Sequence, residues 1–320
     1  MMTERTFDTE QGQEKNLCHG IVFSTSDPEP SLRLQRDSGA QFEPLGLGRT
    51  LSLDVSADKW CLGYVRMDSD GTRRSYACPQ GQRLRTGTQC PGCRRRDETK
   101  FMHHFHTTGE APEGLRRYLM QPHFLYVASF AHGVTKVGTT STSSKFTRLA
   151  SQGAVIARYV ASAPDGAAIR VIEDLVTEQL RITQQVRQKS KIQGLARWDF
   201  DESSLRELND AAAQRVHELL SQQRSLETYG VELLDEPFEQ PSYARTVIDA
   251  WTERRIHPWA AEVPGAHLEL RVRGVLGQGI LADAGEGSEV RILDAAELKT
   301  RALQVRPAGD LQAEGQGSLF

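Results

Sequence analysis

The fold is decided by the stretch FLYVASFAHGVTKVG, residues 124–138. Aromatic and β-branched residues fill both arms of this stretch, and strands favour that composition. The dipeptide His132-Gly133 separates the arms and has the short, glycine-containing form of a hairpin turn. We therefore expect two antiparallel strands, Phe124–Phe130 and Val134–Gly138, at the centre of an α/β unit.

Helix and strand patterns alternate after this hairpin. A short helix at 144–151 would end at Gly153, because glycine is favoured in the left-handed position that follows a helix. A strand at 155–162 and a long amphipathic helix at 166–188 complete a three-stranded unit. Further elements are expected as helices at 203–224 and 242–254 and as a small antiparallel β module within 267–306. The expected fold class is α+β.

Changes in composition divide the chain into six segments. Polar, turn-rich residues at both ends indicate loose termini, whereas cysteines, helix patterns and strand patterns mark the segments between them. The segments are a flexible N-terminal one with short strands (1–40), a small four-cysteine one (41–121), the α/β unit (122–200), a helical one (201–260), the β module (261–306) and a flexible tail (307–320).

Charge is distributed unevenly along the 320 residues. The 39 Lys and Arg nearly balance the 42 Asp and Glu, and a net charge of −3 at pH 7 would argue against a polyanionic partner. However, no Asp or Glu occurs from 114 to 164, whereas acidic residues outnumber basic ones from 199 to 239. The carboxylate-free stretch therefore favours a phosphate-bearing partner.

The apolar pattern excludes two classes of protein. No run approaches the roughly 20 apolar residues that a membrane span requires. The N-terminal residues MMTERTFDTEQGQEKN contain no apolar stretch that could serve as a signal peptide. We therefore expect a cytoplasmic protein with no membrane partner, in which thiols stay reduced.

Four cysteines in the second segment have metal-ligand spacing. They form the pattern C-x16-C-x11-C-x2-C with Cys61, Cys78, Cys90 and Cys93. Four thiolates are the donor set of closed structural zinc sites, and the ion would order a segment that has little core of its own. The alternatives are buried free thiols, or a redox pair in the CPGC element. Cys18 is left over as a buried thiol. His103, His104 and His106 are possible replacement ligands, although the pattern favours a solvated or phosphate-facing histidine patch.

A loop rich in hydroxyl groups follows the second predicted strand. Hydroxyls, backbone amides near a helix start and cationic side chains together can cradle a phosphate. The alternative is a simple capped turn with Ser143 or Ser144 as the helix N-cap. The candidate phosphate ligands are Thr139, Thr140, Ser141, Lys145 and Arg148.

The long predicted helix carries Glu173 at the border of its apolar face. A carboxylate in that position can point into a cleft beside the core and bind a hard cation such as Mg²⁺. By pattern alone, a surface position or a pair with a nearby arginine is more common than a metal ligand.

The order of these elements resembles the GIY-YIG nuclease superfamily. Tyr126 occurs on the first strand, Lys136 begins KVGTT on the second, Arg148 follows on a helix and Glu173 on the last helix. Over residues 61–153 the chain is more closely similar to an uncharacterised bacterial family that joins a four-cysteine cluster to such a unit. The resemblance implies a zinc-ribbon-like segment followed by a GIY-YIG-like three-stranded domain.

The resemblance also implies roles for these residues. Tyr126 would orient the attacking water, Arg148 would stabilise the phosphate, and Glu173 would bind a single Mg²⁺ or Mn²⁺. Lys136 departs from the superfamily, which has a tyrosine there. Lysine could position a phosphate or act as a base if its pKa were lowered, and it could equally mark a unit that has lost catalysis.

Three functions follow from these observations. The first is metal-dependent cleavage of a nucleic-acid phosphodiester in DNA repair, replication or nucleic-acid processing, with DNA favoured over RNA. Arg94, Arg95 and Arg96 would then hold the backbone electrostatically. The second is a zinc-containing protein that binds nucleic acid without cleaving it. The third is an enzyme that uses the same cleft for a small anionic substrate.

The last five residues, QGSLF at 316–320, resemble the peptide with which bacterial repair and replication proteins bind the sliding clamp. Leu319 and Phe320 would enter an apolar pocket, and Gln316 would donate and accept hydrogen bonds. Gly317 departs from the apolar residue usual at its position, and the alternative is an inert tail.

Overall fold

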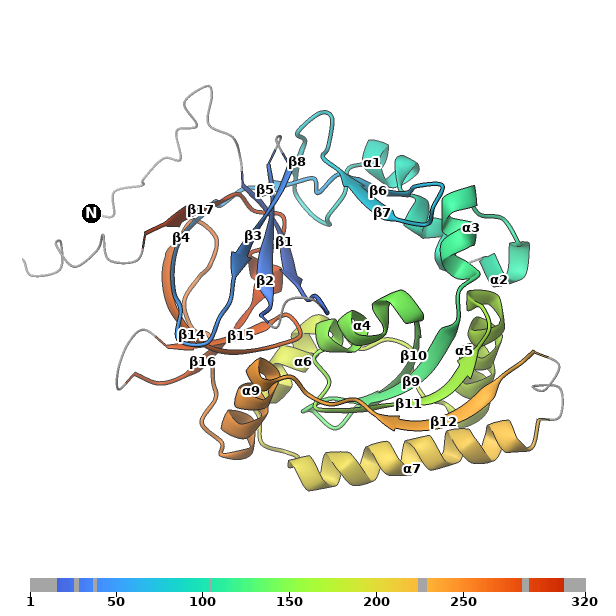
Figure 1. Cartoon of the computed structure of the whole chain (residues 1–320). Helices are drawn as coiled ribbons and strands as arrows, with labels where there is room; N and C mark the ends of the chain where they lie inside the picture. Colours follow the sequence, from blue (N-terminus) through green and yellow to red (C-terminus); the bar gives the residue numbers. More distant parts are fainter. Residues whose placement is uncertain are drawn as a thin grey trace, which may run out of the picture.

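The computed structural model describes residues 16–25, 29–36, 39–103, 105–223, 229–283 and 288–307. It confirms the α+β class: helices and several separate sheets share the chain, including one six-stranded mixed sheet (Figure 1). Among the described residues, no helix combines the length and apolar character that crossing a membrane requires.

The predicted hairpin forms the centre of an antiparallel four-stranded sheet, ordered β10-β9-β11-β12. The three expected strands are present, and β12 extends the sheet at the far edge of β11. Gly138 lies opposite Tyr126 in the register of β9 and β10. The strands are β9 (His123–Ser129), β10 (Thr135–Ser141), β11 (Ile156–Ala163) and β12 (Glu232–Pro237).

Alternation along β9 gives this sheet two buried faces. Leu125 and Val127 pack with α5 and α7 on one face, whereas Tyr126 and Phe130 pack with α4 on the other. Figure 1 shows α7 and α4 on opposite sides of the sheet. The helices are α4 (Lys145–Gln152), α5 (Gly166–Leu180), α6 (Gln188–Leu195) and α7 (Glu202–Ser221).

The prediction of one long helix over 166–188 is wrong beyond Leu180. Arg181 adopts a left-handed conformation, with φ of 58°, and ends α5 after Leu180. The chain then runs beside β10, where the Val137 amide donates to the carbonyl of Thr183 at 3.0 Å. The backbone pairing at Thr183 replaces the helical hydrogen bonds, and α6 starts as a separate helix.

The expected C-terminal β module belongs to the six-stranded mixed sheet, ordered β13-β16-β15-β14-β4-β17. Strand β4 comes from the region before the cysteines and pairs with both β14 and β17. Helix α9 (Ser242–Thr252) packs on β14. The strands are β4 (Thr50–Val55), β13 (His257–Pro258), β14 (His267–Leu276), β15 (Gly279–Asp283), β16 (Arg291–Asp294) and β17 (Leu303–Arg306), with the 3₁₀ helix η3 (Ala295–Glu297) between the last two.

A three-stranded antiparallel sheet lies near the N-terminus and shares its core with the six-stranded sheet. Cys18 is fully buried in that core, as expected for a thiol outside the cluster. The strands are β1 (Leu17–Val22), β2 (Ser31–Arg36) and β3 (Gly39–Pro44).

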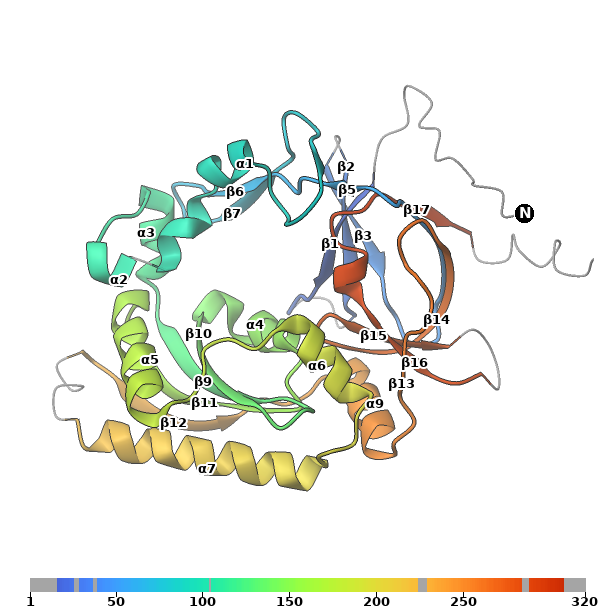
Figure 2. The same cartoon turned by 180° about the vertical axis from the view of Figure 1, so that it is seen from behind.

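The cysteine-bearing region is built from short elements. Figures 1 and 2 show that it connects two parts of the molecule: the β1–β3 sheet with the six-stranded sheet on one side, and the β9–β12 sheet on the other. Its strands pair as two small ribbons, β5 with β8 and β6 with β7. The elements are β5 (Lys59–Trp60), β6 (Tyr64–Met67), β7 (Arg73–Tyr76), β8 (Arg83–Leu84), α1 (Pro91–Arg96), η1 (Glu98–His103), α2 (Phe105–Thr108) and α3 (Glu113–Leu119), and η2 (Thr142–Ser144) precedes α4.

Candidate functional site

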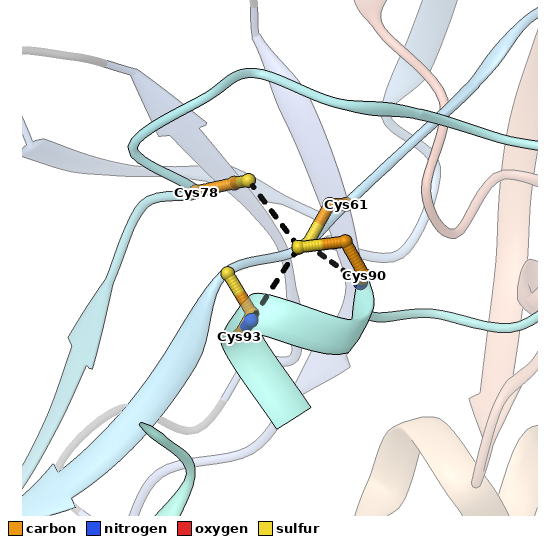
Figure 3. Close-up of side chains that lie close together, drawn as sticks. All are labelled: Cys61, Cys78, Cys90 and Cys93. Carbon is orange, nitrogen blue, oxygen red and sulfur yellow. Dashed lines mark hydrogen bonds between the residues drawn. The ribbon is translucent and has the colours of Figure 1, made fainter. Parts of the chain in front are cut away.

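The four predicted cysteines converge on one point (Figure 3). Their Sγ atoms all lie within 4.8 Å of one another. Cys61 and Cys78 come from the loops after β5 and β7, Cys90 is the N-cap of α1, and Cys93 lies in that helix. Tetrahedral zinc with bonds of about 2.3 Å needs four sulfurs at this kind of spacing. The set could therefore hold a metal ion such as zinc.

Backbone amides in the cluster point at the sulfurs. The amides of Gly63 and Cys90 donate to Cys61 Sγ at 3.4 and 3.2 Å, and the Cys93 amide donates to Cys90 Sγ at 3.4 Å. Burial raises the pKa of Cys61 and Cys93. Burial also acts to raise that of Cys90, but the Cys93 amide and the neighbouring thiols lower the Cys90 pKa to about 7. These donors favour a thiolate, which is the form that binds metal.

The cluster lies in a region with almost no other core. Between residues 58 and 100 the buried apolar side chains are those of Cys61, Cys90 and Cys93. All four cysteines meet, so a redox pair formed by the CPGC element alone does not describe the geometry. His106 instead contacts Asp174, at 3.2 Å between Nε2 and Oδ2. The His103 side chain and His104 lie outside the described residues.

A cleft of about 600 Å³ lies between the β6–β7 hairpin and the start of α4. Three guanidinium groups line it: Arg73 from β7, Arg148 from α4 and Arg170 from α5. No Asp or Glu is among the described residues that line it. The carboxylate-free character expected from the sequence is therefore a property of this cleft, and its charge suits an anion.

Hydroxyl groups form one wall of the cleft. The Ser141 hydroxyl donates to the Tyr118 hydroxyl at 2.9 Å and lies 2.6 Å from Ser144 Oγ. Ser144 occupies the N-cap position of α4, yet its side chain makes no capping hydrogen bond. A simple capped turn therefore does not account for these serines. The predicted ligands Thr139, Thr140, Ser141 and Arg148 all line the cleft.

Three of the four predicted catalytic residues lie behind the cleft wall. Tyr126 is fully buried, and Lys136 and Glu173 are only 5% and 3% exposed. The Glu173 carboxylate forms an ion pair with Arg170, and Thr139 Oγ1 donates to its Oε2 at 3.5 Å. Arg170 and Thr139 both line the cleft, so they connect the buried carboxylate to it.

Burial perturbs the charged groups behind this wall. It lowers the pKa of Lys136 to about 8, with Arg148 adding to the effect and Glu173 opposing it. It raises the pKa of Glu173 against the influence of Arg170 and Lys136. Lys191 on α6 is also buried, and its pKa falls to about 7 because burial is reinforced by Lys136 and Arg148. Arg170 and Lys136 thus act on Glu173, and Arg148 and Lys191 add positive charge beside them.

Gly138 explains why the Tyr126 ring can lie across β10. A Cβ at position 138 would stand 2.4 Å from the Tyr126 hydroxyl oxygen. Lys136 Nζ lies 5.5 Å from the centre of the same ring. Burial raises the pKa of Tyr126, and Arg148 opposes this rise. The phenol is therefore held neutral beside the cations.

His123 is a cleft residue that sequence reasoning missed. It begins β9, is almost completely buried, and lines the cleft. Its Nδ1 lies 2.8 Å from the carbonyl of Gln121, so Nδ1 carries the proton and Nε2 is left as an acceptor. Burial lowers the His123 pKa. Nothing in its sequence context marks it, and Arg73, Arg170, Tyr118 and Lys191 were missed for the same reason.

Other predicted ligands lie away from the cleft. Lys145 pairs with Glu236 at 2.6 Å, and its Nζ lies 4.2 Å from the ring centre of Phe124. The arginines of α1 are exposed on the cysteine-bearing region. The predicted phosphate ligands that do not line the cleft are therefore Lys145, Arg94, Arg95 and Arg96. The tail residues Gln316, Leu319 and Phe320 lie outside the described residues.

Fold and sites together define an α+β protein with a candidate metal centre and a cationic cleft. The chain belongs to the family described as protein of unknown function (DUF2797), whose model matches residues 48–248. That range contains the four cysteines and all the residues that line the cleft. No curated protein and no solved structure matches the chain.

Proposed function

We propose that the chain cleaves phosphodiester bonds in nucleic acid, DNA rather than RNA, as a GIY-YIG-like endonuclease. The observation that carries the proposal is the cleft: Arg73, Arg148 and Arg170 line it without a carboxylate, and Glu173 lies directly behind Arg170. A phosphodiester needs such a cluster of guanidinium groups for charge neutralisation and bidentate hydrogen bonds.

His123 is the group best suited to take a proton in this cleft. A guanidinium group offers hydrogen-bond donors and no acceptor, and Lys136 does not line the cleft. His123 Nε2 is an acceptor, and the lowered pKa keeps the ring neutral near pH 7. His123 therefore accepts the proton of the attacking water, while Lys136 contributes positive charge and holds Tyr126 and Glu173 in place.

The residues around Glu173 fit a hard divalent cation in chemical type. A carboxylate and the Thr139 hydroxyl offer the oxygen donors that Mg²⁺ or Mn²⁺ prefers. Such an ion, when bound, would polarise a phosphoryl oxygen and stabilise the leaving group. Arg170 reaches both the carboxylate and the cleft, so it can turn to the substrate phosphate when Glu173 binds a cation.

One observation favours a second candidate, binding of nucleic acid without cleavage. The Glu173 carboxylate is already neutralised by Arg170. A carboxylate in a permanent ion pair would serve the structure of the cleft and leave phosphate binding to Arg73 and Arg148. The two candidates share the cleft and differ in whether Glu173 is needed for turnover.

A cleavage assay separates these candidates. Purified zinc-loaded protein is incubated with labelled single-stranded, nicked and branched DNA and with RNA, with and without Mg²⁺ or Mn²⁺. Glu173→Gln is expected to lower kcat/KM about 100-fold or more with binding retained. His123→Gln is expected to lose about 100-fold and the rise of kcat/KM with pH, because only the neutral imidazole accepts a proton. Glu178→Gln, at an exposed position of the same helix α5, is the matched control for Glu173→Gln.

The possible results lead to different conclusions. Metal-dependent cleavage that Glu173→Gln abolishes supports the nuclease. Salt-sensitive binding with no cleavage of any substrate supports the second candidate. Absence of both binding and cleavage would contradict any role with nucleic acid and leave the small anionic substrate as the remaining function.

A further inference from the structure

The β6–β7 hairpin carries two stacked tyrosines away from the cleft. Tyr64 and Tyr76 are directly paired across the hairpin. Their ring centres are 5.2 Å apart and their planes differ by 11°. Tyr64 packs against the cysteine cluster, which explains its position, but Tyr76 is 40% exposed. The packing of the cluster therefore does not account for the outer ring.

Two arginines lie beside the inner ring of this pair. The guanidinium carbons of Arg66 and Arg96 lie 5.6 and 5.9 Å from the centre of the Tyr64 ring. Arg66 is 3.9 Å from Glu98, and Arg74 is paired with Asp68. In contrast, the exposed run Arg94–Arg96 has no ion-pair partner within the part of the chain that the structure describes. Of this run, Arg96 lies beside the Tyr64 ring, and α1 packs on β6, so unpaired positive charge lies next to the hairpin that carries the tyrosines.

The same hairpin also forms part of the cleft. Met67 and Arg73 are paired three residues along from the tyrosines, and both line the cleft. Side chains alternate along a strand, so these two residues and the tyrosines project from opposite faces of the ribbon. A polyanion bound in the cleft and a group stacked on Tyr76 would be separated by the thickness of one hairpin.

We propose that the face formed by Tyr64, Tyr76 and Arg94–Arg96 binds an unpaired nucleobase and its adjoining phosphates. Aromatic side chains stack on bases of any sequence, and flanking arginines track the backbone. A base-paired duplex hides the faces of its bases, so the platform selects nucleic acid with a single-stranded segment. The inference rests on the proposed nucleic-acid partner and names its substrate class, but it requires no cleavage.

Two oligomers with equal charge test the platform. Fluorescence anisotropy measures the binding of full-length, zinc-loaded protein to an oligothymidylate and to an abasic oligomer with the same number of phosphates. Tyr76→Ala is expected to weaken oligothymidylate binding about tenfold and to leave abasic binding unchanged. The salt dependence should stay the same, because no cation is removed.

Three variants sharpen this test. Tyr76→Leu keeps apolar bulk without a π face and is expected to behave as Tyr76→Ala. Tyr76→Trp is expected to retain binding. Tyr229→Ala is the matched control, since Tyr229 is 47% exposed and lies far along the chain, before β12. Zinc content is measured for each variant, and one that retains its zinc has kept the cysteine cluster beneath the hairpin.

The outcomes distinguish this inference from the proposed function. Equal affinity of wild type for the two oligomers, or unchanged oligothymidylate binding in zinc-loaded Tyr76→Leu, would overturn the platform even if the protein cleaves DNA. Loss of base-dependent binding in Tyr76→Ala and Tyr76→Leu, with no cleavage detected for wild type, would support the platform and contradict the nuclease. No binding of either oligomer would overturn the platform, and the proposed function would then be decided by the cleavage assay on nicked and branched DNA.

Discussion

The cysteine-bearing region and the β9–β12 unit hold their polar groups in different ways. Between residues 58 and 100 the buried apolar side chains are three of the cysteines themselves. The β9–β12 sheet has a hydrophobic cluster on each face, and these clusters fix the positions of Tyr126, Lys136 and Glu173. We therefore expect the first region to depend on a bound ion for its order, whereas the second has an apolar framework of its own.

The two regions also differ in the sign of their unbalanced charge. The cysteine cluster gathers four potential thiolates and needs a cation. Behind the cleft, Arg170 and Lys136 act on the buried Glu173 carboxylate, whereas Arg148 and Lys191 add further positive charge, so the cleft suits an anion. We therefore expect loss of a cation from the cysteine cluster to unfold the first region, and we expect the second to stay folded while its cleft is empty.

Replacement of a cysteine ligand is the largest expected perturbation. Cys93→Ser is expected to lower the zinc content from about one per chain to well below one. Structural zinc sites contribute apparent binding energies of about 10–16 kcal/mol, so the region 58–100 should lose its structure. Hydrogen exchange measured by mass spectrometry should show fast exchange there and unchanged protection in β9, β10 and β11.

Cys18→Ala is the control for this experiment, because Cys18 is buried but lies outside the cluster. Zinc content should stay at wild-type level in this variant. Full zinc occupancy and normal protection of residues 58–100 in Cys93→Ser would show that the cysteines act as ordinary buried thiols.

The regions also differ in how far sequence could predict them. The four cysteines could be predicted as a metal-binding set because the CPGC pair is a local pattern and few residue types bind metal ions. The hairpin at 124–138 was readable from composition and its turn. By contrast, Lys191 contacts the end of α4, where the Gln152 carbonyl accepts from its Nζ at 3.0 Å, and no local pattern encodes a contact across 39 residues.

Backbone conformation and long-range strand pairing account for the other differences between the sequence predictions and the structure. Arg181 ends α5 in a left-handed conformation that is unusual for a residue other than glycine, so the apolar periodicity of 166–188 was continued too far. Pairing partners such as β4 and β12 come from distant parts of the chain, and strand patterns do not name their partners. The helix pattern alone favoured a surface position or an arginine pair over a metal ligand for Glu173, and the structure shows the pair with Arg170.

Removal of a buried cation tests the charge excess in the second region. Burial lowers the pKa of Lys191 to about 7, so the unfolded chain binds more protons than the folded one between about pH 7 and 10.5. Wild-type stability should therefore rise with pH through that window. Lys191→Met should reduce this rise to the part that Lys136, with a pKa lowered to about 8, contributes. It should also increase the free energy of unfolding at pH 6 by on the order of 2–4 kcal/mol, after allowance for the lost hydrogen bonds to Gln152.

Urea unfolding at pH 6, 7.5 and 9 measures this effect, and Lys189→Met on the exposed face of α6 is the matched control. The control should unfold as wild type does at each pH. A Lys191→Met variant less stable than wild type at pH 6, with the rise retained, would show that the amine is stabilised by its surroundings and that the region has no excess positive charge.

The smallest effect concerns packing, and it compares one glycine from each region. Gly138→Ala would place a Cβ 2.4 Å from the Tyr126 hydroxyl oxygen, against a side chain that the core holds on both sides, and should cost about 1–3 kcal/mol. Gly92→Ala, in α1, would place its Cβ 3.9 Å from Cys90 Sγ, which is ordinary contact, and should be neutral or stabilise the helix by up to about 1 kcal/mol. Urea unfolding monitored by Tyr and Trp fluorescence gives both values. If Gly138→Ala were as stable as wild type, Tyr126 could move freely, and the preformed framework inferred for the β9–β12 unit would be wrong.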